Sequence, residues 1–364
     1  MNAALRYVTT SDGVSIAFAS FGDGPPVVFA SNIFGDLALG HIPWQMARAT
    51  TDGLVARGWR VVRYDVRGMG ASDRERSDAG LEGRVRDLEA VIHALGLERF
   101  ALAGVDEGAA TALAFAAIHP RKVTQLVLLS PWLRGSDRYS IPGARFAAGI
   151  APTDRPDWRF FMNALSSIAT DFGSGIQARE LAAAMEEATT PEALAVHRRA
   201  SVEINLASYL ARLNFPVLVV HDPHFAFGSL ELAREVADGI PGAIFTVIDE
   251  NSIAGEQHEQ NVAAIDEFLL TGKLNPAPGT VDGSGARPAK GHLTVRETEV
   301  LGLLASGLSN KEIAALLTLA VTTVERHLVN VYAKIGARGR ADATAYALRH
   351  GLGARGRAPS TGFP

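Results

Sequence analysis

The chain has 364 residues and no cysteine, which leaves room for two or three domains and excludes disulfides, thiolate nucleophiles and cysteine metal sites. Its net charge of −4 hides an asymmetry: residues 290–364 carry 10 Lys and Arg against 5 Asp and Glu, and the remainder carries 25 against 34. A basic end on an acidic body indicates nucleic-acid binding. No apolar run reaches the ~18–20 residues that span a bilayer. No leader is visible at the N-terminus, so we expect a cytoplasmic protein without membrane contact.

Strand and helix patterns alternate over most of the first 270 residues. Short apolar or alternating runs predict strands at 6–9, 14–20, 27–30, 60–64, 100–103, 123–129, 216–221 and 243–248. Amphipathic spacing predicts helices at 43–57, 81–95, 109–119, 229–240 and 260–270. This order predicts an α/β fold with a doubly wound, mostly parallel sheet. Residues 131–213 are instead helical and aromatic, which predicts a cap over the carboxyl edge of the sheet, where open α/β sheets bind ligands.

One glycine-flanked stretch, Gly104-Val105-Asp106-Glu107-Gly108, follows an apolar strand and opens an Ala-rich helix. In that context a G-x-S-x-G motif presents a nucleophilic serine above a sheet. The glycines permit a sharp turn and a close approach of helix and strand. Aspartate stands at the nucleophile position here, so the chemistry of this half of the chain depends on Asp106.

Residues 1–272 resemble the α/β-hydrolase family. Besides the elbow, the match includes Asp65-Val66-Arg67-Gly68-Met69-Gly70-Ala71-Ser72, which is similar to the family's D-x-R-G-x-G-x-S loop, and His119-Pro120 before the next strand. Three separated motifs in the family's order make the resemblance specific. It implies an α/β-hydrolase sheet with a helical cap at about 131–213.

The resemblance also implies where a catalytic triad would lie, and all three positions differ. The nucleophile position holds Asp106, the acid position holds Phe225 and the histidine position holds Asn251. Serine hydrolysis needs a nucleophile, a histidine and an orienting acid together. We therefore expect no catalytic residue and no enzyme activity.

An enzymatic alternative stays open, because some relatives use aspartate as the nucleophile. Asp106 would then form an ester, and His258 with Asp222 would activate the water that clears it. Against this alternative, Glu107 adds a second carboxylate where an oxyanion would form.

A binding pocket does not depend on the triad. The backbone N–H groups of Glu107 and of Asn32 or Ile33 remain available to a ligand oxygen, and apolar walls with a few polar groups describe a ligand site. We expect a mainly apolar effector with a hydroxyl or carbonyl group, such as a phenol, lactone or ester, bonded to Asp106. We expect no cofactor and no metal. The predicted ligand-binding residues are Ser31, Asn32, Ile33, Phe34, Asp106, Glu107, Trp132, Trp158, Phe161, Phe225 and Asn251.

Residues 273–291 are rich in Pro and Gly and cannot build a core, which predicts a linker. Two capping boxes follow, Thr294 with Glu297 and Ser309 with Glu312, and Gly307 ends the first helix. Further helices are expected at 310–317, 322–335 and 341–350. The short connection before 322–335 predicts a helix-turn-helix.

Residues 292–352 resemble the LuxR/GerE-type DNA-binding domain, and 353–364 form a tail. The match runs through Leu293-Thr294-x-Arg296-Glu297, Gly307-Leu308-Ser309-Asn310-Lys311-Glu312-Ile313-Ala314, Thr323-Val324-x-x-His327-Leu328 and Tyr332-x-Lys334-Ile335-Gly336. The resemblance implies a sequence-specific transcription regulator, usually dimeric, with 322–335 as its recognition helix.

Spacing divides that recognition helix into two faces. Val324, Leu328, Val331 and Ile335 repeat every three to four residues and should face the core. The opposite face offers side chains to base edges, and basic or hydroxyl groups around it suit phosphates. The predicted DNA-binding residues are Lys311, Thr322, Thr323, Glu325, Arg326, Val329, Asn330, Lys334, Arg338 and Arg340.

We interpret the chain as a ligand-responsive regulator that binds a pseudo-palindromic operator in double-stranded DNA as a homodimer. Its other partners would be a small-molecule effector and, as a candidate, RNA polymerase. The first alternative is a bifunctional regulator with hydrolase activity at Asp106. A second alternative makes the N-terminal domain a protein-interaction or dimerisation module with an empty pocket.

Overall fold

The structure is a computed structural model that describes residues 3–42, 46–74, 78–149, 157–170, 175–223, 225–248, 256–274, 295–317, 319, 321–335, 337 and 339–349. The chain divides into two compact units, residues 1–283 and 284–364. Within the described part, no helix has both the length and the apolar character needed to cross a membrane.

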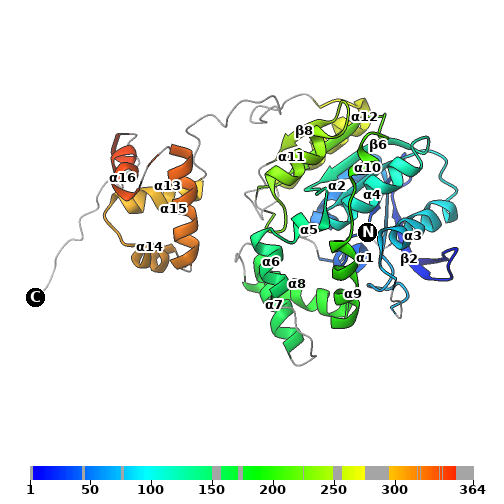
Figure 1. Ribbon diagram of the computed structural model, residues 1–364, viewed down its shortest axis with the longest axis horizontal. Helices are drawn as coiled ribbons and strands as arrows, with labels where there is room; N and C mark the ends of the chain where they lie inside the picture. Colours follow the sequence, from blue (N-terminus) through cyan, green and yellow to red (C-terminus); the bar gives the residue numbers. More distant parts are fainter. Residues whose placement is uncertain are drawn as a thin grey trace, which may run out of the picture. The chain divides into compact units, whose positions relative to one another are not determined.

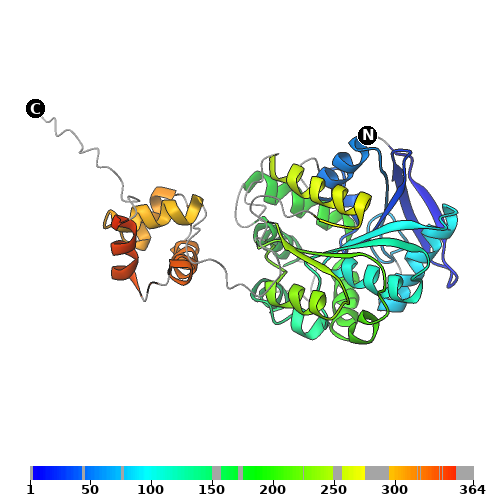
Figure 2. The ribbon, with the colours of Figure 1, turned by 90° about the horizontal axis from the view of Figure 1, so that it is seen from above.

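The first unit is built on an eight-stranded sheet in the order β1-β2-β4-β3-β5-β6-β7-β8. β1 and β2 form an antiparallel hairpin at one edge, dark blue in Figure 2, and the strands from β3 to β8 pair in parallel. The predicted doubly wound, mostly parallel sheet is therefore confirmed. The strands are β1 (Arg6–Thr9), β2 (Ser15–Phe21), β3 (Pro26–Ala30), β4 (Arg60–Tyr64), β5 (Phe100–Val105), β6 (Val123–Leu129), β7 (Val217–His221) and β8 (Ile244–Val247).

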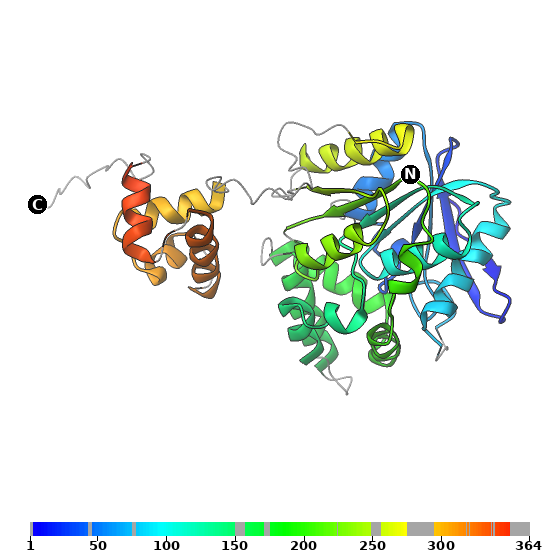
Figure 3. The ribbon, with the colours of Figure 1, turned by 45° about the horizontal axis from the view of Figure 1, so that its top comes forward.

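Helices cover both faces of this sheet, which explains why its central strands are apolar throughout. α2 (Met46–Ala56) and α12 (Glu256–Thr271) contribute to the core on one face. α3 (Leu81–Ala94), α4 (Glu107–Ile118) and α11 (Leu230–Asp238) contribute to the core on the other. Figure 3 shows α12, in yellow, on one side of the strands. A short α1 (Asp36–Leu39) follows β3.

The helical insertion lies between β6 and β7, as predicted from the sequence. Its helices are α5 (Gly135–Arg138), α6 (Pro142–Gly149), α7 (Trp158–Ala169), α8 (Gly175–Ala188), α9 (Pro191–Val202) and α10 (Ala207–Leu210). Figure 1 shows α6 to α9 grouped at one end of this unit. Phe161 on α7 and Met185 on α8 belong to a small core that also includes Ile33 and Met69 from the sheet's loops. The cap therefore packs on the strand ends through apolar contacts.

The second unit consists of α13 (Val295–Ala305), α14 (Asn310–Leu317), α15 (Val321–Ile335) and α16 (Arg340–Arg349). The capping box at Ser309 is confirmed: the Glu312 N–H donates to Ser309 Oγ at 3.4 Å, and the Ser309 N–H donates to Glu312 Oε2 at 2.7 Å. Gly307 has φ 91°, the left-handed conformation that ends a helix. Thr294, the other predicted cap, lies outside the described residues.

Candidate functional site

The turn between β5 and α4 has the geometry of a nucleophile elbow. Asp106 adopts φ 50° and ψ −110°, a conformation that costs energy for a residue with a side chain. A Cβ on Gly104 would lie 2.4 Å from the Gly108 carbonyl oxygen, and one on Gly108 would lie 2.3 Å from the Ala30 oxygen. Both glycines are therefore required, as the motif predicts.

Both oxygens of the Asp106 carboxylate are bonded by protein groups. Trp132 donates its indole N–H to Oδ1 at 2.9 Å. Arg138 donates from Nε to Oδ1 at 2.8 Å and from Nη2 to Oδ2 at 2.6 Å. Asp106 is only 3% exposed. A guanidinium and an indole thus bond both Asp106 oxygens, and the expected hydrogen bond from a ligand to Asp106 stays a prediction.

Glu107 accepts hydrogen bonds at one oxygen, Oε2. Arg84 donates from Nη1 to Glu107 Oε2 at 2.8 Å, and the Ser201 hydroxyl donates to the same oxygen at 2.7 Å. Arg138 Nε lies 3.6 Å from Glu107 Oε1. Two adjacent carboxylates are thus matched by two guanidiniums, which offsets the repulsion expected from the sequence.

The environment shifts the pKa of each elbow carboxyl differently. Burial raises the pKa of Asp106 above its ordinary value, against the opposing attraction of Arg138. Burial also acts to raise the pKa of Glu107, but the charges of Arg138 and Arg84 outweigh it and lower that pKa. Glu107 is therefore held as an anion inside the protein, where a charge persists only when it is paired.

These partners come from distant parts of the sequence. Trp132 and Arg138 belong to the segment that begins the cap, Ser201 lies on α9, and Arg84 lies on α3. The hydrogen bonds therefore attach the cap directly to the elbow. The sequence analysis did not predict Arg84 or Arg138 as partners of the elbow. The available signal was the pair of consecutive acidic residues in an apolar stretch, because two buried carboxylates require buried cations.

Of the backbone amides expected to form an oxyanion hole, those of Asn32 and Ile33 have partners. The Asn32 N–H lies 3.4 Å from Asp36 Oδ1, and the Ile33 N–H donates to the Asn32 side-chain oxygen at 2.6 Å. The side chain of Ser31 donates to the Asn32 carbonyl. This loop thus satisfies its own donors, and it differs from the open donor pair expected for a ligand oxygen.

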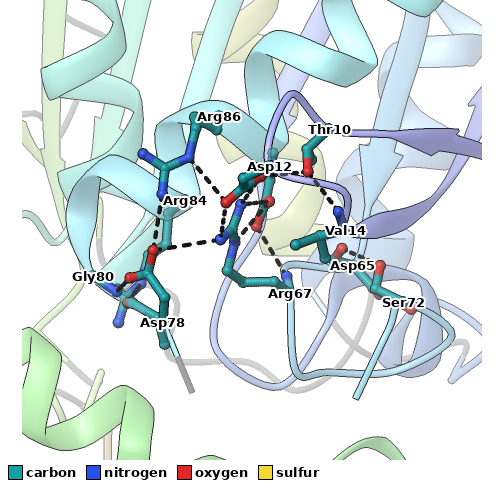
Figure 4. A network of polar contacts seen from close by, with 12 residues as sticks. Thr10, Asp12, Val14, Asp65, Arg67, Ser72, Asp78, Gly80, Arg84 and Arg86 are labelled. Carbon is teal, nitrogen blue, oxygen red and sulfur yellow. Dashed lines mark hydrogen bonds and ion pairs between the residues drawn. The ribbon is translucent and has the colours of Figure 1, made fainter. Parts of the chain in front are cut away.

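The loop after β4 is held by a second charged network, drawn in Figure 4. Arg67 donates from Nε to Asp87 Oδ1 at 2.9 Å and from Nη1 to Asp12 Oδ2 at 2.8 Å. Arg86 bonds Asp12 as well, and it also bonds Asp78. This network joins the β1–β2 hairpin to α3. The D-x-R-G-x-G-x-S segment therefore has a structural role here.

Apart from Trp132, which bonds Asp106, several predicted ligand-binding residues lie in other parts of this unit. Ile33 and Phe161 are buried in the cap core, with Phe34 and Trp158 packed against it. Phe225 lines a separate cavity, together with the fallback acid Asp222. Asn251, and the side chain of the fallback base His258, lie outside the described residues.

This separate cavity lies at the carboxyl ends of β5, β6 and β7, against α12. Its volume is about 20 Å³. Its walls are Val105, Leu129, Ser130, Val220, Asp222, Phe225, Ile248, Asn261 and Ile265. No member of the elbow ion pairs contributes to these walls, so the cavity is distinct from the space that Arg138 fills.

The helix α15, expected to be the recognition helix, has the two faces that its spacing predicts. Val324, Leu328 and Val331 are buried in the core of the second unit. Glu325, Arg326, Val329 and Asn330 are exposed, as is Lys311 on α14, while Thr323 is half-buried. Residue Arg338 and the side chain of Thr322 lie outside the part of the chain that the structure describes.

Two of the predicted phosphate contacts have partners inside the second unit. Lys334 Nζ lies 2.7 Å from Glu297 Oε2, and the Glu297 side chain is almost fully buried. Arg340 donates to the carbonyl of Leu304 on α13 and to that of Leu308 in the connection that follows. Both side chains therefore have partners within the helix bundle, which their place in the sequence did not indicate.

Two sequence families match separate parts of the chain. Residues 291–347 match the bacterial regulatory proteins of the luxR family, and residues 25–160 match the alpha/beta hydrolase fold. The chain joins an α/β-hydrolase-fold domain to a LuxR-family DNA-binding domain. The fold class and both resemblances predicted from the sequence are confirmed.

Similar proteins include hydrolases of the same fold. The AB hydrolase superfamily protein YisY of Bacillus subtilis (strain 168) is 32% identical over 126 residues, 34% of this chain and 44% of that protein, so less than half of that relative is matched. The esterase EaEST from Exiguobacterium antarcticum superposes with a TM-score of 0.61 at 17% identity, over 73% of this chain and 99% of that chain. The enol-lactonase from Burkholderia xenovorans LB400 gives 0.59 at 21% identity, over 73% and 100%. These similarities establish the fold.

Proposed function

We propose that this chain is a ligand-responsive transcription regulator whose hydrolase-fold domain no longer catalyses hydrolysis. The observation that carries the proposal is the bidentate ion pair between Arg138 and Asp106. A nucleophilic aspartate needs an accessible lone pair facing the substrate carbon. The Asp106 oxygens instead face a guanidinium and an indole in a buried setting. The hydrolase-fold unit that contains them is joined to a domain that binds DNA.

The proposal includes the arrangement on DNA that the exposed face of α15 supports. A homodimer would place two such helices in successive major grooves of a pseudo-palindromic operator, with half-sites about one helical turn apart. Arg326 and Asn330 are exposed and carry the donors and acceptors that suit guanine and adenine. The proposal also includes RNA polymerase as a candidate partner and a cytoplasmic location for the protein.

Catalysis is tested by incubating the purified full-length protein with activated esters, lactones and haloalkanes. We expect product release no faster than in a buffer blank, with an esterase of the same fold as the positive control. Turnover that disappears in Asp106→Asn would refute the loss of catalysis and support the bifunctional alternative.

Effector control of DNA binding is tested by calorimetry of an effector with and without operator. By thermodynamic linkage, an effector that changes operator affinity must bind with a different affinity when operator is present. Equal affinities in both titrations would contradict ligand control and favour an interaction module with an unused pocket.

A further inference from the structure

We propose that the cavity between the elbow strand and α12 is the effector site of the hydrolase-fold domain. The structure assigns it a small molecule that carries a hydrogen-bond donor, a hydroxyl or an ammonium group, on an apolar stem. This inference rests on the proposed ligand-responsive function and moves the binding site away from Asp106. Val105 lines the cavity, whereas the next residue, Asp106, is bonded to the cap.

Asn261 supplies the first argument. It lies on α12, lines the cavity and is 8% exposed. Its Oδ1 atom is buried and, among the residues that the structure describes, has no hydrogen-bond partner. A buried acceptor without a donor costs roughly 1–3 kcal/mol, and buried polar groups in folded proteins are normally satisfied. A donor that enters the cavity removes this cost, which gives such a ligand a specific gain in binding.

Two further oxygen-bearing side chains line the same space. Ser130 and Asp222 follow β6 and β7, at the edge where parallel sheets bind ligands. Ser130 has φ 46°, an uncommon conformation for a residue with a side chain, and its Oγ lies 3.5 Å from the Asp222 N–H. Backbone strain of this kind clusters at ligand sites.

The polar wall is therefore rich in acceptors. A carboxylate ligand would bring a like charge to Asp222, and an ester or lactone would bring only acceptors to Asn261 Oδ1. A hydroxyl or ammonium group brings the missing donor. Among the effectors expected from the sequence, this chemistry favours phenols and other hydroxyl compounds over lactones and esters, and it adds amines.

The size of the cavity decides how much of the ligand enters. A volume of about 20 Å³ accommodates about one group of the size of a water molecule. The head group fills this space, and the first carbons of the stem contact the apolar walls of Leu129, Phe225 and Ile248. The donor is thus recognised inside the cavity, while the remainder of the molecule extends from it.

Three probes of equal chain length test this assignment on the ¹⁵N-labelled full-length protein: n-butanol, n-butylamine and sodium butyrate. We expect the backbone amide of Ile265, one helical turn from Asn261, to shift in a saturable way with the alcohol or the amine, and not with butyrate. The alcohol and amine arms distinguish a hydroxyl ligand from an ammonium ligand.

Two variants examine the hydrogen bond itself. Asn261→Leu should weaken binding of the preferred probe about tenfold, because one buried hydrogen bond is lost. Asn261→Asp keeps an acceptor at the same position and should retain binding. Asn163→Leu on α7, a polar-to-apolar change outside the cavity walls, should leave the affinity unchanged.

Several outcomes would overturn the assignment. No saturable shift with any probe would mean that the cavity holds only water. Preferential binding of butyrate, or loss of binding in Asn261→Asp, would mean that the cavity presents donors. Because Asn261→Asp is the milder change, it decides the question if Asn261→Leu fails to fold. Each of these results leaves operator binding and the absence of hydrolysis untouched, since both are measured separately.

Discussion

Arg138 and Asp106 form a two-bond ion pair in which Nε meets Oδ1 at 2.8 Å and Nη2 meets Oδ2 at 2.6 Å. The fork of a guanidinium matches a carboxylate in this geometry. Arg138 comes from the four-residue helix α5, so the pair attaches the start of the cap to the elbow. The residue at the nucleophile position is thus bonded to a side chain of the cap.

Loss of this arginine should destabilise the first unit strongly. Arg138→Met leaves the buried carboxylates of Asp106 and Glu107 with Arg84 as their remaining guanidinium, and we expect a loss of ~3–5 kcal/mol in the free energy of unfolding. Urea denaturation of the full chain, followed on the transition of this unit, measures it.

A second variant separates charge from packing. Asp106→Asn combined with Arg138→Met removes both charges and should recover about half of the lost free energy. Arg134→Met is the matched control, because Arg134 bonds Asp137 and Glu235 at the surface and should change stability little. Equal effects of Arg134→Met and Arg138→Met would contradict the importance of the buried pair.

Acid should destabilise the first unit through His197. Burial, with the nearby charge of Arg84, lowers the pKa of His197 to about 3, against an ordinary value of 6.5. Between these values the unfolded chain binds a proton that the folded chain does not. The contribution of His197 to the free energy of unfolding is therefore fully present above pH ~6.5, and it is lost as the pH falls towards 3.

The free energy of unfolding, measured at pH ~7.5 and at pH ~5, shows whether stability falls with acid as expected. His221, whose pKa burial lowers to about 4, adds to the same loss, while Asp87, whose pKa burial raises to about 6, opposes it. We expect His197→Gln to lose less stability between the two pH values than the natural protein. The exposed His93→Gln should behave like the natural protein, and a His197→Gln profile as steep as this control would refute the assignment.

On DNA, Arg326 and Lys311 should behave differently. Arg326→Ala removes a base-reading group and should cost ~1–3 kcal/mol on the operator while relaxing sequence preference. Lys311→Ala removes a phosphate contact and should weaken binding to all sequences, reducing the salt slope by about one unit. Titrations of operator and random duplexes at several salt concentrations measure both effects. Equal losses on both duplexes for both variants would mean that the reading face is assigned wrongly.

Lys334 should affect stability more than DNA affinity. Lys334→Met leaves the carboxylate of Glu297 inside the second unit without its ammonium partner. We expect a loss of ~1–2 kcal/mol, between the values for exposed and buried pairs because Lys334 itself is partly exposed. Thermal unfolding of the second unit in the full chain measures this loss. A large loss of operator affinity with unchanged stability would instead support the phosphate contact predicted from the sequence.

The sequence by itself determined the features that depend on local chemistry. Periodicity placed β4 and β6 at their observed bounds, the two glycines located the elbow, and Ser309 with Glu312 marked the start of α14. The exposed and buried faces of α15 followed from helical spacing alone, because a helix repeats every ~3.6 residues whatever surrounds it. The changed nucleophile at Asp106 was also visible without coordinates.

Only the tertiary structure decided what surrounds those residues. Arg138 lies 32 positions beyond Asp106, and Arg84 lies 23 positions before Glu107, so no spacing rule joins them. The same holds for Asn261 beside Val105. Buried charges must find partners wherever packing brings them, and that choice depends on how the cap and α12 dock on the sheet. For this reason the sequence identified the aspartate at the nucleophile position, while the fold determined that an arginine pairs with it and that a small cavity lies beside Val105.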